Sequence, residues 1–539
     1  MDGIIQTPNP VNEPAFDYAP GTATRHTLQA TLAAMREETR DLPSIIDGQE
    51  ITGPVIDVRS PHDHHRIIAR THQAGESGTS LAIVAAMRAR HDWAALPFEQ
   101  RAAVFLRAAE LFAGPYRARI NATTMLGQGK TAHQAEIDSA CELIDFLRFN
   151  VHYARKLQFD QPISTHEIWN QVEHRPLDGF VLAITPFNFT AIAGNLPTAP
   201  ALLGNTVVWK PASSAALSNQ VIMDVLREAG LPNGVINLVH GTGPEISNVA
   251  MMHPDLAGVH FTGSTQVFKS LWSMVGQNIN TYKSYPRLVG ETGGKDFIVA
   301  HPSADIQALA VGLIRGAFEY QGQKCSAASR AYIPESMWPE LSERLIAEVS
   351  ALKVGDTSDF SNFMGAVIDE RAYRKIAAYI DLAKEDSSTT IVTGGTYDDS
   401  TGYFIQPTIV LTTDPKHRLM REEIFGPVLT IYCYPDAQYT EMLKLVDETA
   451  PYALTGSIFA RDRYAILQAS NVLRFAAGNF YINDKCTGAV VGQQPFGGGR
   501  ASGTNDKAGS PLNLLRWINM RTVKENLKPP LAVGYPYML

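Results

Sequence analysis

GFVLAIT (residues 179–185) is the first of five short apolar runs that decide the fold of this chain. Each run has the length of a β-strand, and the stretch between the second and third runs, NQVIMDVLREAG (219–230), has the spacing of an amphipathic helix that ends at a glycine. Strands that are apolar on both faces and alternate with helices are typical of a parallel, doubly wound α/β sheet. The other four runs are NTVVWK (205–210), GVINLVH (234–240), AGVHFTG (257–263) and RLVGE (287–291).

A second alternating block follows Asp296 and predicts a second α/β domain. Two such domains leave a cleft between them, where a cofactor and a substrate can meet. Upstream of both blocks, we expect an irregular arm over residues 1–60 with one helix at 27–38, followed by helices from 80 to 156. The second block contains the runs FIVAH (297–301), TIVLTT (408–413), VLTIYCY (428–434) and TGSIFA (455–460), with a helix near 306–319.

Composition narrows the class of protein. The chain has 539 residues, 45% of them hydrophobic and 19% charged, which is the profile of a globular enzyme with more than one domain. A net charge of −8 without a long basic run argues against nucleic acid and anionic membranes as partners. The four cysteines lie far apart without a C-x-x-C pair, so we predict no metal site and a reducing compartment.

The N-terminal sequence and the absence of long apolar stretches bear on location. MDGIIQTPNPVNEPAFDYAP has neither the apolar core of a signal peptide nor the arginines of a transit peptide. No apolar stretch approaches the roughly 20 residues that a membrane span requires. We expect a soluble intracellular protein, cytoplasmic in a bacterium or in the mitochondrial matrix of a eukaryote.

The segment YQGQKCSAASR (320–330) contains the main candidate for a nucleophile. Cys325 lies among polar residues, and a nearby cation with exposed backbone amides lowers the pKa of a thiol toward the reactive thiolate. Cys486, in the polar loop NDKCTG, is its rival, whereas Cys141 and Cys433 have the apolar neighbours of inert packing cysteines. On this pattern alone, Cys325 is either a nucleophile or another packing residue.

Two further motifs follow predicted strands and carry polar groups suited to catalysis. Glu291, in GETGGK (290–295), precedes two glycines and can reach into a cleft as a base, or it is a surface glutamate beside a turn. Asn188, in TPFNF (185–189), offers an amide N–H to an oxyanion, or it is a turn residue. Each motif alone favours the plainer alternative.

Two more motifs suit the binding of phosphates or ribose. Gly263 and Ser264, in FTGSTQV (261–267), end a strand and open a helix, where free backbone N–H groups attract an anion. The plainer interpretation is a helix cap. Lys210, in VWKP (208–211), ends another strand and suits ribose or phosphate oxygens, or it faces water.

Taken together and in this order, the motifs resemble those of the aldehyde dehydrogenase superfamily. TPFNF, NTVVWKPA, FTGS, GETGGK, the cysteine after Gly-Gln-Lys and EEIFGPV (422–428) look like its landmarks, with Phe187 in place of a tryptophan. Glu291 and Cys325 lie 34 positions apart, as the general base and the nucleophile of that family do. The stretches ETGGKDF, YQGQKCSA and NDKCTGAVVGQQPFGGGRASGTNDKAGSP (483–511) resemble the branch of Δ1-pyrroline-5-carboxylate, or glutamate-γ-semialdehyde, dehydrogenases.

The resemblance implies a role for each matching position. Cys325 is then the nucleophile, Asn188 helps to hold the oxyanion, and Glu291 activates the water that hydrolyses the thioester. Glu142 is a further candidate that faces the substrate ammonium group or lies on a helix surface. The implied NAD-binding residues are Thr185, Lys210, Gly263, Ser264, Thr265, Gln266, Val267, Glu423 and Phe425, and the implied substrate-binding residues are Ser326, Gly488, Ala489, Phe496 and Phe189.

Two positions depart from the family pattern. Many members that prefer NAD have a glutamate three residues beyond the cofactor lysine, where this chain has Ser213, so NADP is not excluded. Ala489 stands where this branch often has a serine, which removes one hydroxyl and leaves the backbone N–H.

The resemblance also implies a domain plan and an activity. It assigns residues 1–160 and 181–290 to a Rossmann-type NAD-binding domain, 291–503 to an α/β catalytic domain, and 161–180 with 504–539 to a small β flap that makes a homodimer or larger oligomer. The implied reaction is the NAD-dependent oxidation of L-glutamate γ-semialdehyde to L-glutamate through a cysteine thioester, the second step of proline degradation. The alternatives are an aminoadipic or succinic semialdehyde dehydrogenase, a relative that passes the thioester to coenzyme A, and a non-catalytic structural relative.

Overall fold

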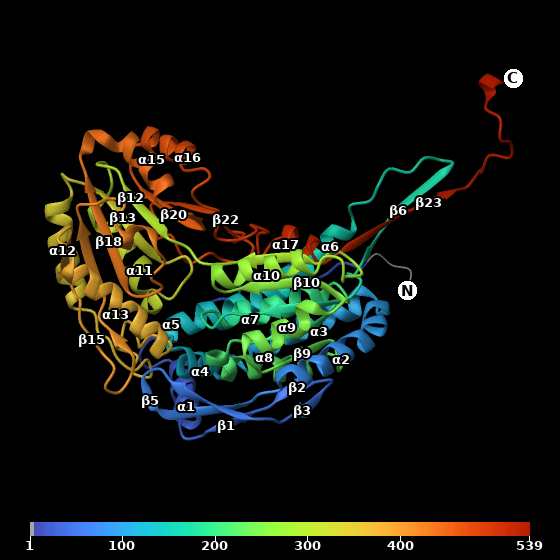
Figure 1. Ribbon diagram of the computed structural model, residues 1–539, viewed down its shortest axis with the longest axis horizontal. Coiled ribbons are helices and arrows are strands. Elements are labelled where there is room, and N and C mark those ends of the chain that lie inside the picture. Colours follow the sequence, from blue (N-terminus) through green and yellow to red (C-terminus); the bar gives the residue numbers. More distant parts are fainter. Residues whose placement is uncertain (1–4, 539) are drawn as a thin grey trace.

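The five apolar runs between residues 179 and 291 form the parallel part of a seven-stranded sheet in the computed structural model, which describes residues 5–538 (Figure 1). The strand order is β11-β10-β7-β8-β9-β2-β3, so the order reverses between β7 and β10. In open α/β sheets, ligands bind outside the carboxyl ends of the strands at this switch point. The five strands are β7 (Phe180–Ile184), β8 (Thr206–Lys210), β9 (Ile236–Leu238), β10 (Leu256–Thr262) and β11 (Arg287–Glu291).

Helices cover both faces of this first sheet. Because successive side chains of a strand point to opposite faces, Phe180 and Leu182 pack into one hydrophobic core and Val181 and Ala183 into another. The first core is closed by α2 (Gly75–Ala95), α9 (Gly243–Met252) and α10 (Thr265–Gln277). The second is closed by α3 (Phe98–Ala113), α6 (Glu142–Gln158), α7 (Thr190–Leu202) and α8 (Ala216–Glu228).

The predicted second α/β block is a separate seven-stranded sheet of order β14-β17-β18-β13-β12-β20-β21, in which only the edge strand β14 is antiparallel. Helices α11 (Ile306–Phe318) and α12 (Trp338–Ser350) cover one face, and α15 (Tyr439–Thr449) and α16 (Arg463–Val472) cover the other (Figure 1). The strands are β12 (Asp296–Ala300), β13 (Ala328–Pro334), β14 (Thr389–Thr393), β17 (Thr408–Thr412), β18 (Val428–Tyr434), β20 (Thr455–Phe459) and β21 (Asn479–Ile482).

The N-terminal region is more regular than its sequence predicts. The expected helix is α1 (Ala23–Arg36), which begins earlier because the Thr22 side chain accepts a hydrogen bond from the Arg25 N–H and caps it. The prediction of an otherwise irregular arm is wrong for residues 40–60. Short strands cross this region, and several are too exposed to leave an apolar pattern: β1 (Arg40–Leu42), β2 (Ser44–Ile46), β3 (Gln49–Ile51), β4 (Val55–Ser60) and β5 (Asp63–His72).

The expected β flap is a two-stranded antiparallel ribbon that projects from the body of the molecule (Figure 1). It pairs β6 (Ile168–Arg175) with β23 (Asn519–Asn526). The ribbon begins later than the expected boundary at residue 504, because the Thr504 N–H donates to the Gly290 carbonyl at 2.9 Å and holds this segment against β11. Within residues 5–538, no helix combines the length and the apolar character needed to cross a membrane.

Candidate active site

Cys325 lies in a strained loop between α11 and β13, which we call the nucleophile loop (residues 319–326). Tyr320 and Gln321 both adopt left-handed backbone angles, with φ of 54° and 56°, which is costly for residues that have a side chain. The surroundings hold this conformation in place: the Gln321 side-chain amide donates to the carbonyls of Gly129 at 2.9 Å and Ala366 at 2.7 Å. The backbone before Cys325 is therefore held by contacts from outside its own loop.

The Cys325 thiol is buried, and its electrostatic environment differs from the sequence-based prediction. Burial raises the pKa of this thiol well above its ordinary value, and the carboxyl groups of Glu291, Asp296 and Glu423 raise it further. The predicted lowering is wrong because the neighbouring cation points elsewhere: Lys324 Nζ lies 3.3 Å from Glu319 Oε2 and 3.8 Å from Asp138 Oδ2. The thiol form is therefore favoured over the thiolate near neutral pH.

The rival cysteine has the surroundings of a packing residue. Cys486 is completely buried within the hydrophobic core between α11 and the second sheet. Its Sγ donates to the Ser326 carbonyl at 3.3 Å, and burial raises the pKa of its thiol above the ordinary range. The polar sequence around Cys486 thus hides an apolar site, and the arrangement favours Cys325 as the nucleophile.

Glu291 ends β11, and the two glycines after it bring its strand against the nucleophile loop. A Cβ on Gly294 would overlap the Cys325 carbonyl oxygen, and one on Gly293 would overlap the Glu423 carboxylate. A side chain at Gly294 is therefore excluded by the backbone of Cys325, and one at Gly293 would displace the Glu423 carboxylate. The GETGGK motif therefore joins the predicted base, the predicted nucleophile and a predicted cofactor residue in one small region.

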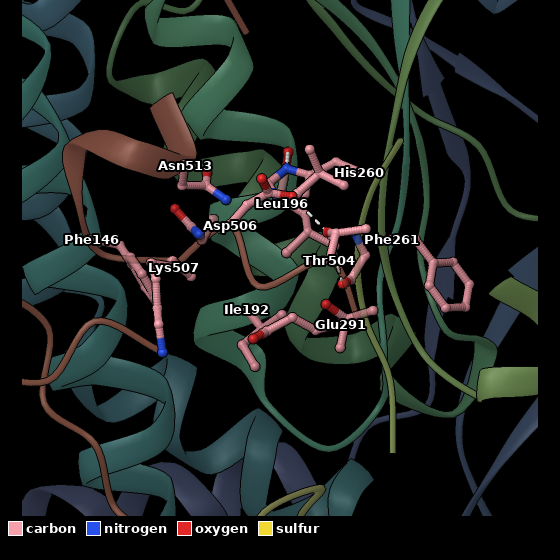
Figure 2. Close-up of a pocket in the computed structure, with 15 residues that line it drawn as sticks. Phe146, Ile192, Leu196, His260, Phe261, Glu291, Thr504, Asp506, Lys507 and Asn513 are labelled. Carbon is pink, nitrogen blue, oxygen red and sulfur yellow. Dashed lines mark hydrogen bonds between the residues drawn. The ribbon is translucent and has the colours of Figure 1, made fainter. Parts of the chain in front are cut away.

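A small cavity of about 20 Å³ lies behind Glu291 and has room for one water molecule (Figure 2). Burial raises the pKa of Glu291 to about 8, while the Lys507 ammonium opposes this rise and Asp506 adds to it. Glu291 Oε1 has no hydrogen-bond partner among residues 5–538. A buried carboxylate with this pKa is suited to take up a proton near neutral pH.

Sequence reasoning missed the polar residues that surround this cavity and assigned them to the flap. Figure 2 shows Thr504, Asp506 and Lys507 around the same cavity as Glu291. Thr504 Oγ donates to Asp506 Oδ2 at 2.6 Å, and Lys507 Nζ donates to the carbonyl oxygens of Gly478 at 2.8 Å and Gly497 at 3.0 Å. The polar run TNDK, directly after a glycine-rich segment, is the one sequence feature that pointed to them.

Asn188 lies beside the nucleophile loop, as its predicted role requires. It follows β7 at the switch point and is buried, and its side-chain Nδ2 donates to the Gln323 carbonyl at 3.0 Å. An amide nitrogen carries two hydrogens, so a second N–H remains for an oxygen atom near Cys325. This geometry supports the oxyanion role over that of a plain turn residue.

The helix that follows β10 opens onto a groove of about 780 Å³. Ser264 caps α10 by accepting a hydrogen bond from the Val267 N–H at 3.3 Å, so the helix-cap interpretation is confirmed. The cap leaves other N–H groups of the first turn without helical partners, and Thr265 and Gln266 line the groove together with Glu423. Val267 lies beyond them on the helix and is half exposed, and Gly263 joins the strand to the helix.

The remaining predicted cofactor residues lie at or near the switch edge of the first sheet. Thr185 accepts a hydrogen bond from the Trp209 indole N–H at 3.0 Å, and burial lowers the pKa of Lys210 at the end of β8. Phe425, with a positive φ of 61°, packs edge-to-face against Phe187, with 5.9 Å between ring centroids.

Glu423 lines the groove beside α10, and Ser213 lies at the position that affects the choice between NAD and NADP. The Glu423 carboxylate accepts the Gly294 N–H at 3.0 Å. Ser213 is exposed just beyond β8, so no carboxylate occupies that position.

The predicted substrate loop, which we call the anchor loop (residues 487–496), contacts the nucleophile loop directly. The hydroxyl groups of Thr487 and Ser326 lie 2.8 Å apart and share a hydrogen bond. Gly488 is exposed, with a φ of 98° that disfavours a side chain, and Ala489 beside it is partly buried. Phe496 is fixed by two backbone hydrogen bonds with Ala508, at 3.0 and 2.8 Å.

Two predicted groups lie on the other side of the site. Phe189 is partly buried, and Lys130 Nζ lies 4.2 Å from the centre of its ring. Glu142 begins α6 and is partly buried near Asp138 and Lys130 rather than on a helix surface. Burial raises the pKa of Glu142 well above its ordinary value, and the Asp138 carboxylate adds to this rise.

Comparison with known proteins agrees with this geometry. Residues 47–523 match the model of the aldehyde dehydrogenase family. The chain is 53% identical over 536 residues to the mitochondrial delta-1-pyrroline-5-carboxylate dehydrogenase of Dictyostelium discoideum, covering 99% of this chain and 96% of that protein. It is 48% identical over 529 residues to the human protein of the same name, covering 98% of this chain and 94% of that protein.

A solved structure gives the same result. The structure of the delta-pyrroline-5-carboxylate dehydrogenase from Mycobacterium tuberculosis bound with NAD matches this fold with a TM-score of 0.97. The two sequences are 55% identical, and the match covers 100% of both chains. This chain therefore belongs to the aldehyde dehydrogenase family.

Proposed function

We propose that this protein oxidises L-glutamate γ-semialdehyde, the open form of Δ1-pyrroline-5-carboxylate, to L-glutamate with NAD, the second step of proline degradation. The observation that supports this most strongly is the end-to-end match to delta-1-pyrroline-5-carboxylate dehydrogenases at 53% and 55% identity, including one structure bound with NAD. The proposed catalytic groups Cys325, Glu291 and Asn188 lie at loops that meet at the switch edge of the first sheet.

The residues present fit the cofactor. The groove beside α10 has room for a dinucleotide and offers backbone N–H groups at a helix N-terminus, which suit a pyrophosphate. Lys210 and Glu423 would hold the ribose groups, and Phe425 would pack on the nicotinamide side, supported by Phe187. When bound, NAD supplies the acceptor for the hydride that leaves the substrate. Ser213 places no negative charge where it would repel a 2′-phosphate, so we propose NAD as the main cofactor with NADP tolerated.

The chain's own residues then account for the remaining steps. The Cys325 thiol gives up its proton to water, and the sulfur attacks the aldehyde carbon. The Asn188 amide and the Cys325 backbone N–H hold the resulting oxyanion. Once the hydride has left, the acyl group is bound to Cys325 as a thioester. Glu291 then takes a proton from water, which attacks the thioester and releases the carboxylic acid.

The substrate's far end matches the anchor loop. Backbone N–H groups near Gly488 and Ala489 and the hydroxyl of Ser326 suit an α-carboxylate, and the rings of Phe189 and Phe496 suit the short aliphatic stem. Glu142 is suited to face the ammonium group. We also propose that residues 291–503 form the catalytic domain.

We further propose that the projecting ribbon makes a homodimer or larger closed oligomer. Its strands carry exposed apolar side chains, Trp169 and Met520. Within residues 5–538, the outer edge of β23 has no strand partner and could pair with a strand of another chain, whereas the side chains of Gln161 and Ser164 cover the outer edge of β6. Several related proteins from eukaryotes are named mitochondrial. The location proposed for this protein is the matrix in a eukaryote and the cytoplasm in a bacterium.

A panel of aldehydes tests the proposed function in one assay. We expect kcat/KM for glutamate γ-semialdehyde to exceed that for butyraldehyde or succinic semialdehyde by about one to two powers of ten, because only the first can bind both the anchor loop and Glu142. Aminoadipic semialdehyde, which is one methylene longer, should be disfavoured less. Equal values for all four would contradict the substrate assignment, and no NADH with any aldehyde would indicate a non-catalytic relative.

A further inference from the structure

Five charged side chains of alternating sign form a buried line beneath the proposed substrate site, and we call this line the charge chain. Lys485 Nζ donates to both carboxylate oxygens of Glu319, at 2.9 and 2.7 Å. Glu319 Oε2 also accepts from Lys324 at 3.3 Å, and Lys324 lies 3.8 Å from Asp138. Asp138 Oδ2 in turn accepts from Lys130 at 2.7 Å.

The charge chain is deeply buried in its middle and closer to solvent at one end. The Lys130 side chain is fully inaccessible, that of Lys324 is 2% exposed, and those of Asp138 and Glu319 are 9% exposed. The Lys485 side chain is 22% exposed. Buried ion pairs add little stability, because removing charges from water costs about as much as their attraction returns. The best-attested role of buried ion pairs is to fix one arrangement of the groups that they join.

Both ends of the charge chain touch a wall of the proposed substrate site. Lys130 Nζ lies 4.2 Å from the ring centre of Phe189 and 4.4 Å from that of Tyr320. At the other end, Lys485 lies two residues before the anchor loop, and a Cβ on Gly488 would lie 3.5 Å from Lys485 Cε. The Lys485 side chain therefore lies under the backbone turn that would hold the substrate carboxylate.

The middle of the charge chain lies beside the proposed nucleophile in the sequence. Lys324 is the residue before Cys325, and Glu319 begins the strained turn that leads to it. The pair Lys485–Glu319 is thus the charged link between the anchor loop and the nucleophile loop, alongside the hydrogen bond of Thr487 to Ser326. This link joins the loop that contains Cys325 to the segment that leads into the loop proposed to hold the far carboxylate.

We propose that Lys485 and Glu319 are positioning residues that set the span between nucleophile and anchor loop, and so select an aldehyde that carries an amino-acid end. This proposal rests on the proposed function. A plain aldehyde needs only Cys325, Asn188 and Glu291, so its oxidation does not depend on the ion pair of Lys485 with Glu319. An aldehyde that binds at both ends is sensitive to it, because the loop must present its backbone N–H groups at a fixed distance from the sulfur.

The test compares two substrates in the full-length Lys485→Met variant, which keeps the length of the stem and loses the charge. We expect KM for glutamate γ-semialdehyde and Ki for the product glutamate to rise together by about tenfold, with kcat changed less than twofold. For butyraldehyde, we expect both kcat and KM to stay within about twofold of the wild-type values. Lys485→Arg, which retains the charge, should recover most of the lost affinity.

A matched control comes from the same domain. Arg461 pairs with Asp305 on the surface, and the Arg461 side chain is 72% exposed. Arg461→Met should therefore leave kcat and KM unchanged for both aldehydes. Glu319→Gln, which keeps a hydrogen-bonding amide in place, should reproduce the Lys485→Met pattern and tests the partner independently of how well Lys485→Met folds. A double variant should lose no more than the single ones, since both remove the same link.

Different outcomes separate this proposal from the proposed function. Equal losses for both aldehydes would show a general structural role and overturn the proposal, and so would an unchanged KM for glutamate γ-semialdehyde. If the wild-type enzyme itself does not prefer glutamate γ-semialdehyde to butyraldehyde, the proposed function fails together with the proposal.

Discussion

The loops around Cys325 and Cys486 have similar sequences and different surroundings. Both thiols follow a lysine in a polar segment, both are buried, and burial raises the pKa of both. Cys325 lies close to the carboxyl groups of Glu291 and Glu423, whereas Cys486 is packed in a hydrophobic core and donates to a backbone carbonyl. The groups gathered around each thiol therefore distinguish the two cysteines, whereas the polarity of the local sequence and the direction of the pKa shift do not.

Removal of each sulfur gives the largest contrast. We expect Cys325→Ala to lower NADH formation at least about a thousandfold while NAD still binds, because only the covalent step is lost. Cys486→Ala should keep more than about half of the activity. Steady-state NADH formation and cofactor titration of each variant check this. An exchange of the two phenotypes would contradict the comparison.

Glu291 is the clearest difference between the surroundings of the two thiols, because it lies near Cys325 and not near Cys486. We expect Glu291→Gln to slow steady-state turnover by about two to three powers of ten, because the amide cannot take a proton from the hydrolytic water. A burst of about one NADH per active subunit should precede the slow phase if the thioester still forms. Stopped-flow absorbance measures both phases. A variant without a burst would show that Glu291 is needed earlier, to deprotonate Cys325.

The pH profile tests the electrostatics around Glu291. With a pKa of about 8, its carboxylate form grows as the pH rises, so the rate should increase up to about pH 8 and then level off. Lys507 holds this pKa down, and Asp506, the Cys325 thiol and the cavity residue His260 are the other titratable groups on this side of the protein. The pKa of His260 is about 4, so it stays neutral over the range.

Loss of the Lys507 charge should therefore shift this profile. We expect Lys507→Met to move the rising limb roughly one pH unit upward, because a nearby positive charge favours the carboxylate form. Lys507→Arg should leave the limb near its original position. The measurement is kcat from pH 6 to about 10, and a downward shift for Lys507→Met would contradict the assignment of the limb to Glu291.

Much of the fold was predictable from the sequence because buried parallel strands leave unmistakable apolar runs. All five runs from residue 179 to 291 are strands, and so are the four runs of the second block. The strands of residues 40–60 were not predictable, because they are short and partly exposed and leave no alternation to detect. Their order in the sheets depends on long-range pairing such as that of Ile45 with Leu238.

The candidate site was predicted in part for a similar reason. Glu291 ends one strand that the pattern reveals and Asn188 follows another, and both meet the loop between α11 and β13 that contains Cys325. The pKa of Cys325 was predicted in the wrong direction, since the direction of the Lys324 side chain depends on Glu319 and on Asp138, which lies almost 200 residues away. Lys507 and Asp506 were missed because only the folded chain brings the segment after residue 503 back to β11.

The smallest predicted effect is on stability at the rival cysteine. Cys486→Ala should lower the free energy of unfolding by about 1–2 kcal/mol, because it leaves a small cavity in a packed core and removes the contact with the Ser326 carbonyl. Urea unfolding of the variant and the wild-type enzyme measures the difference. A stability unchanged by the substitution, with activity lost, would mean that Cys486 has a chemical role.

The most direct test of the central claim, that Cys325 carries the acyl group, is to map the covalent intermediate. The Glu291→Gln variant is mixed with NAD and glutamate γ-semialdehyde, quenched in acid during the slow phase, digested, and examined by mass spectrometry. We expect a glutamyl thioester on the peptide that contains Cys325 and none on the peptide that contains Cys486. An adduct on Cys486, with Cys325 unmodified, would contradict it.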